Sequence, residues 1–185
     1  NLTLTGFLNI NGTGNELNNI LTGNAGINSL TGGDGFDIAI GGPGDDTYFS
    51  VEQIIEYAGE GIDTWFKPNG GTLPDNVENL YMGTYGPQWT PLGSGSSYTY
   101  YPGTAIGNEL DNILVSPGNG TSGNVLDGRG GADTMVVNGS DKVTVYVDNP
   151  GDKIISVSKP PYEIRSTIDY ALAEPRRYAW DNQYI

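Results

Sequence analysis

A nine-residue period limits how this chain can fold more than any other feature of the sequence. From residue 14 the chain reads GNELNNILT, GNAGINSLT, GGDGFDIAI and GGPGDDTYF without a slip in register, so that the four segments fill residues 14–49. Each segment has six turn-prone residues and then three that favour extended structure, which is typical of a tight loop leading into a very short strand. A helix of this composition would lose about 1 kcal/mol for each Gly relative to Ala. The period therefore predicts loops and strands.

The eighth position of each nonapeptide is the one expected to point inward. It is occupied by Leu21, Leu30, Ala39 and Tyr48. One inward side chain per strand buries little area, so coils of two nonapeptides must stack on one another to build a core. We therefore predict an all-β fold, a right-handed parallel β-roll (a β-solenoid), in which residues 18 apart lie on the same edge.

A longer repeat divides the chain into two related units. The segment GNELDNILV at 107–115 nearly repeats GNELNNILT, and LDGRGGADTMV at 126–136 matches LTGGDGFDIAI. The first unit is residues 1–76, with its nonapeptides at 14–49. The second is residues 77–185, with degenerate nonapeptides at 107–145, in which Lys142 stands where an acid is expected. Calcium chemistry is expected to be weaker in that loop.

An insertion at 84–102 distinguishes the second unit from the first. It places five aromatic residues among Gly, Ser and Pro: Tyr85, Trp89, Tyr98, Tyr100 and Tyr101. Such rings can fold back over an edge of the roll, dock on a protein partner, or stack on the faces of a glycan. The sequence leaves these three roles open.

Charge and composition exclude several classes of function. Residues 1–128 carry 14 acids and one base, Lys67, so this part attracts cations and repels nucleic acid and anionic membranes. The chain has no His and no Cys, which removes imidazole and thiolate metal sites, disulfides and the usual nucleophile and base pairs. No apolar run approaches the length of a membrane span. We predict a protein without enzymatic activity.

The nonapeptides resemble a known family. GGDGFDIAI and GGPGDDTYF are similar to the haemolysin-type calcium-binding repeat GGxGxDxUx of RTX proteins, which Gram-negative bacteria export, and the other two segments are variants with Asn in the sixth position. The resemblance implies a β-roll, calcium as the cofactor, and a secreted or cell-surface location.

The same resemblance implies which residues hold calcium. Each ion would lie between loops one coil apart, 18 residues in the first unit, bound by sixth-position side chains and by loop carbonyls that the glycines free. The expected ligand residues are the pairs Asn19 with Asp37, Asn28 with Asp46 and Asn112 with Asp133, together with Gly32, Gly33, Gly35, Gly41, Gly42 and Gly44. The alternative is that each Asn only caps its turn by hydrogen bonding to backbone amides, without a metal.

Three functions remain open at this point. The chain is expected to be a calcium-binding segment that folds on binding the ion and has a structural or partner-binding role. It could instead be the export or anchoring portion of a larger secreted enzyme or toxin. It could also assemble with copies of itself or another subunit through the solenoid ends, as in a surface layer or filament.

Overall fold

The computed structural model describes residues 1–83, 102–117, 123–138, 142–156 and 162–167. Over these residues the chain forms short strands joined by loops, with no helix and hence none that could cross a membrane. The strands are β1 (Leu2–Thr3), β2 (Gly12–Thr13), β3 (Ile20–Thr22), β4 (Ser29–Thr31), β5 (Ile38–Ile40), β6 (Thr47–Phe49), β7 (Gln53–Ile55), β8 (Thr64–Phe66), β9 (Gly70–Thr72), β10 (Asn79–Tyr81), β11 (Thr104–Ile106), β12 (Ile113–Ser116), β13 (Asn124–Asp127), β14 (Thr134–Val137), β15 (Val143–Val147), β16 (Lys153–Ser156) and β17 (Tyr162–Ser166).

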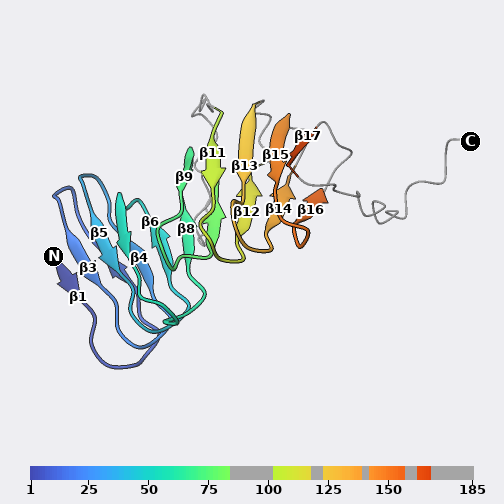
Figure 1. Cartoon of the computed structure of the whole chain (residues 1–185). Helices are drawn as coiled ribbons and strands as arrows, with labels where there is room; N and C mark the ends of the chain where they lie inside the picture. Colours follow the sequence, from blue (N-terminus) through green and yellow to red (C-terminus); the bar gives the residue numbers. More distant parts are fainter. Residues whose placement is uncertain (84–101, 118–122, 139–141, 157–161, 168–185) are drawn as a thin grey trace, which may run out of the picture.

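The strands form a parallel β-solenoid, which confirms the predicted fold class. Sheet A has the order β1-β3-β5-β7, sheet B runs β2-β4-β6-β8-β10-β12-β14-β16, and sheet C has the order β9-β11-β13-β15-β17. Sheet B extends along the whole solenoid, while sheet A accompanies its first half and sheet C its second (Figure 1). Every pair of neighbouring strands is parallel, because the chain makes one circuit before it adds the next strand to a sheet.

The predicted stacking of residues 18 apart holds within the nonapeptides. Leu21 pairs with Ala39 in sheet A, and Leu30 pairs with Tyr48 in sheet B. All four of these side chains, the predicted inward positions, are completely buried. Full burial of one such aliphatic side chain stabilises a fold by about 1.5–3 kcal/mol, so the core depends on many stacked coils.

The coils change length after the nonapeptides end. Tyr48 pairs with Trp65, 17 residues on, and Leu80 pairs with Leu114, 34 residues on, because that circuit includes the insertion. The core nevertheless continues without a break through Leu114 and Leu126. Outside the core, the rings of Phe49, Phe66 and Tyr81 stack along sheet B with centroids 4.9 and 5.0 Å apart. This spacing matches the distance between neighbouring strands.

The two repeat units sit half a coil out of phase with each other. Leu30 lies in β4 of sheet B, whereas its counterpart Leu126 lies in β13 of sheet C. Likewise, Ala39 of sheet A corresponds to Met135 of sheet B. A residue on one edge of the first unit therefore has its counterpart on the opposite edge of the second unit.

Candidate metal centre

Acidic side chains form a ladder where the chain enters sheet B. In five coils, the carboxylate just before the strand accepts a hydrogen bond from the backbone N–H of the corresponding residue one coil earlier, while Asn28 and Asn112 hold this position in two other coils. Asn28 donates to Asp46 Oδ1 at 2.7 Å, Asp46 to Asp63 Oδ1 at 2.8 Å, and Asp63 to Glu78 Oε2 at 2.7 Å. We call the five acids of this edge, Asp46, Asp63, Glu78, Asp133 and Asp152, the carboxylate ladder.

The second unit continues the ladder, and the opposite edge has a shorter one. Asn112 N–H donates to Asp133 Oδ1 at 2.8 Å, and Asp133 N–H donates to Asp152 Oδ1 at 3.0 Å. On the edge that leads into sheet A, Asn19 N–H donates to Asp37 Oδ1 at 2.7 Å, and Asp37 N–H donates to a Glu52 carboxylate oxygen at 2.8 Å. These bonds tie successive coils together.

The structure brings together all three Asn and Asp pairs that the sequence singled out. The contact runs from the backbone N–H of Asn19, Asn28 or Asn112 to the Asp carboxylate. The Asn side chains themselves cap their own loops, because each Oδ1 accepts the N–H of the residue four positions earlier at 2.8 Å. The turn-capping role therefore exists, and any role of these amide oxygens as ligands is additional to it.

Four carboxylate oxygens are buried without a hydrogen-bond partner among the described residues. They are Asp37 Oδ2, Asp46 Oδ2, Glu56 Oε2 and Asp133 Oδ2. Their residues are between 0 and 6% exposed. An ionised carboxylate that loses water without gaining a partner carries a large free-energy cost, so these oxygens need a cation or a proton.

Burial also raises the pKa values of five of the acids in these loops. Desolvation raises the pKa of Asp46 to about 7 and that of Asp63 to about 8, and the nearby charge of Glu56 adds to both. Desolvation and the charge of Asp152 raise the pKa of Asp133 to about 7. The pKa values of Glu56 and Glu78 are also raised, chiefly by burial. Ionisation of these acids at neutral pH therefore destabilises the folded chain.

The glycines proposed as ligands have two structural roles. A Cβ at Gly41 would collide with Asp46 Oδ2, the Tyr48 hydroxyl and Glu56 Oε1, and one at Gly32 would collide with Asp37 Oδ2. These glycines leave room for the carboxylates. The others have positive φ angles that side chains rarely adopt, from +84° to +134°: Gly33, Gly35, Gly42 and Gly44.

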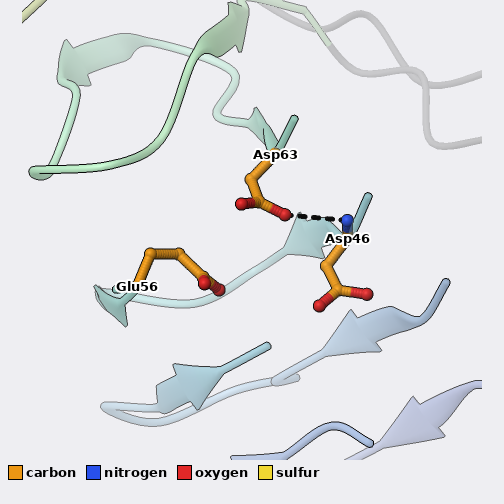
Figure 2. A group of neighbouring side chains, drawn as sticks. All are labelled: Asp46, Glu56 and Asp63. Carbon is orange, nitrogen blue, oxygen red and sulfur yellow. Dashed lines mark hydrogen bonds between the residues drawn. The ribbon is translucent and has the colours of Figure 1, made fainter. Parts of the chain in front are cut away.

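One group of acids is close enough to share a single ion. Carboxylate oxygens of Asp46, Glu56 and Asp63 all lie within 4.8 Å of one another, and all three residues are buried. Asp46 precedes β6, Glu56 follows β7 and Asp63 precedes β8, so three neighbouring segments supply them (Figure 2). Sequence reasoning missed Glu56 and Asp63 because they lie beyond the last nonapeptide. Both flank short apolar strands, which was the available signal.

The register corrects one expectation for the second unit. Asn124 pairs with Val143, so Val143 and not Lys142 occupies the position of the acid in that loop. One extra residue between β14 and β15 displaces Lys142 from the place that sequence counting gave it. The five aromatic residues of the insertion, Tyr85, Trp89, Tyr98, Tyr100 and Tyr101, lie outside the described residues.

Comparison with known proteins adds no relative. No protein-family model matches this sequence, and neither a curated protein nor a solved structure matches it. Any function must therefore be argued from the chain itself.

Proposed function

We propose that this chain is a calcium-stabilised β-roll segment of a secreted or cell-surface bacterial protein, with a structural or partner-binding role. The observation that carries the proposal is the set of buried carboxylate oxygens without a hydrogen-bond partner, above all those of Asp37, Asp46 and Asp133. Calcium prefers six to eight oxygen ligands, mainly carboxylates and backbone carbonyls. The loops offer both kinds.

The charge distribution supports a cation from solution. The one ion pair among the described residues joins Arg165 to Glu163, both of them exposed and distant in sequence from the nonapeptides. Among the described residues, the buried carboxylates of the first unit therefore form no ion pair with a basic side chain. A divalent ion would remove the repulsion between stacked acids and supply the missing partner at the same time.

Calcium would then act as a folding ligand. An ion that binds only the folded chain stabilises it by about 2.7 kcal/mol when the free concentration is 100 times the dissociation constant. At low calcium the acids repel one another, and the chain is expected to stay unfolded; where calcium is plentiful it folds. This behaviour suits a protein that is exported before it folds.

Calorimetric titration with calcium tests the proposal. The wild-type chain, freed of metal, should bind calcium with a measurable heat at pH 7.5. The variants Asp37→Asn and Asp133→Asn keep an acceptor oxygen at the ladder position but lose the charge, so each should bind fewer ions or bind them more weakly. Asp34→Asn, which changes an exposed loop acid, is the matched control and should bind as wild type does. The absence of any heat from the wild type would contradict the proposal.

A further inference from the structure

The hydrogen bonds around Glu56 leave the group of three acids incomplete. Glu56 Oε1 accepts bonds from the Tyr48 hydroxyl and from Gly41 N–H, the latter at 3.0 Å. One oxygen of Asp63 accepts the N–H of Asp46. Asp46 Oδ2 and Glu56 Oε2 remain buried without a partner, although their residues are only 1% and 6% exposed. Two unpartnered oxygens thus belong to a buried group of three carboxylates.

Gly41 shows that these groups face one space. An added Cβ on Gly41 would meet Tyr48 Oη, Asp46 Oδ2 and Glu56 Oε1 together. Polar atoms from three different side chains therefore converge beside the same backbone atom. We call Gly41, Asp46, Tyr48, Glu56 and Asp63 the junction group, because they lie where sheet A passes to sheet B at the end of the nonapeptides.

The second repeat unit provides an internal comparison, because it builds the same junction without these groups. Ala39 pairs with Ile54 in the first unit as Met135 pairs with Ile154 in the second, and Tyr48 pairs with Trp65 as Val145 pairs with Ile164. From these registers, the counterparts of Gly41, Asp46, Tyr48, Glu56 and Asp63 are Val137, Val143, Val145, Ser156 and Tyr162. All five positions differ, and no acid remains.

Three of the five replacements are buried valines. Val137, Val143 and Val145 are completely buried, so side chains of the second unit occupy the core where the first unit has Gly41, Asp46 and Tyr48. By contrast, the neighbouring acids Asp37 and Glu52 have acidic counterparts in the second unit. These are Asp133 and Asp152, which make the same inter-coil hydrogen bond. The coil therefore closes without the junction group, and the burial of three acids serves something other than closing it.

We propose that Asp46, Glu56 and Asp63 form a buried site for one calcium ion, a site that the second repeat unit lacks. Oxygens that bind one calcium ion at about 2.4 Å lie up to about 4.8 Å apart. The three carboxylate oxygens all lie within 4.8 Å of one another, so one calcium ion can reach all of them. Asp46 Oδ2 and Glu56 Oε2 gain the partner that they lack.

This site deepens the proposed function and rests on it, since it names one place where calcium binds. It differs from the nonapeptide pairs because two of its three carboxylates come from residues beyond 49. With three acids in place of one acid and one Asn, it is expected to bind calcium more tightly than the loop of Asp133.

The test combines calorimetry with terbium luminescence on the whole chain at pH 7.5. Terbium replaces calcium in oxygen sites, and light absorbed by Tyr48, whose hydroxyl bonds to Glu56, excites a terbium ion bound in the junction group. The variant Glu56→Gln keeps the shape of the side chain and removes its charge. It should lose one bound calcium ion of the tightest class and most of the sensitised emission. Asp34→Asn, which changes an exposed loop acid outside every proposed site, is the matched control and should keep both signals of the junction group.

A second variant covers the case in which Glu56→Gln does not fold. It combines Gly41→Val, Asp46→Val, Tyr48→Val and Glu56→Ser, the residues of the second unit, with Asp63→Asn. It should fold and should bind at least one ion fewer than wild type, because it also removes the Asp46 carboxylate from the pair with Asn28. If Glu56→Gln and this variant bind as many ions as wild type with unchanged affinity, the junction site is wrong while the proposed function stands. If wild type binds no calcium at any pH and folds only in acid, protons alone neutralise the acids, and both proposals fall.

Discussion

Replacing Asp133 by Asn should change the stability of the chain in opposite directions with and without calcium. Asp133 is completely buried before β14, its Oδ1 accepts the N–H of Asn112 at 2.8 Å, and its Oδ2 has no partner. The amide of Asn keeps the acceptor and removes the charge. In calcium-free solution at pH 8 the substitution should therefore stabilise the folded chain.

The raised pKa of Asp133 sets the size of the effect. Burial raises this pKa from 3.8 to about 7, so the folded chain holds its proton more tightly than the unfolded chain. The folded chain is therefore more stable at low pH, where Asp133 is protonated, and it loses this stability as the pH rises from about 4 to about 7. Because a pKa difference of one corresponds to about 1.4 kcal/mol, ionised Asp133 costs the folded chain at most about 4 kcal/mol at pH 8. Asp133→Asn should raise the free energy of unfolding by up to this amount at pH 8 and by little at pH 4.

Osmolyte-driven folding measures this effect without calcium. With EDTA present, trimethylamine N-oxide is added until the circular dichroism signal of the β-roll appears. At pH 8 the variant should need less osmolyte than wild type, while at pH 4 the two should coincide. Asp34→Asn, at an exposed position, is the control and should have no effect at either pH. With saturating calcium the order should reverse, because the variant lacks a ligand. An unchanged midpoint at pH 8 would mean that burying the ionised Asp133 carboxylate costs no stability.

Three further predictions follow from the core, the loops and the ladder. Leu114→Ala removes a fully buried side chain from sheet B and should lower the free energy of unfolding by about 2–5 kcal/mol in urea denaturation; a loss below 1 kcal/mol would mean that the stacked core is loose. Gly33→Ala forces a Cβ onto a residue with φ of +115° and should destabilise the folded chain by about 1 kcal/mol or more, while Gly14→Ala, at negative φ, tests crowding alone. Without calcium, stability should fall as the pH rises from about 4 to about 8, because the folded-state pKa values of Asp46 and Asp63 are raised to about 7 and about 8; a stability that rises over this range would contradict the burial of these acids.

The fold was predictable because the nine-residue repeat determines the geometry of each coil. Six loop residues and three strand residues in strict register fix the coil, and the eighth position identified Leu21, Leu30, Ala39 and Tyr48 as the first core residues, all of them completely buried. The register of the second unit was less predictable. One added residue moved Val143, and not Lys142, into the position of the acid, because the hydrogen-bonded pairing and not the residue count decides which side chain points inward.

The acidic loops were only partly predictable. The pairs Asn28 with Asp46 and Asn112 with Asp133 follow from stacking, but nothing in the residue pattern indicates that the backbone N–H of Asn makes the contact. Glu56 and Asp63 lie in coils that have lost the nine-residue period, so no repeat marks them. Their proximity to Asp46 depends on a strand pairing of Tyr48 with Trp65 that only the folded structure supplies.

Circular dichroism of the metal-free chain shows whether calcium is the ligand that drives folding. In excess EDTA at pH 7.5 the chain should be largely disordered, because its buried acids have neither a cation nor a proton. Addition of millimolar calcium should produce the β signal and a cooperative thermal transition, and magnesium at the same concentration should produce much less. A chain that is fully folded in EDTA, and equally resistant to heat with and without calcium, would contradict the account.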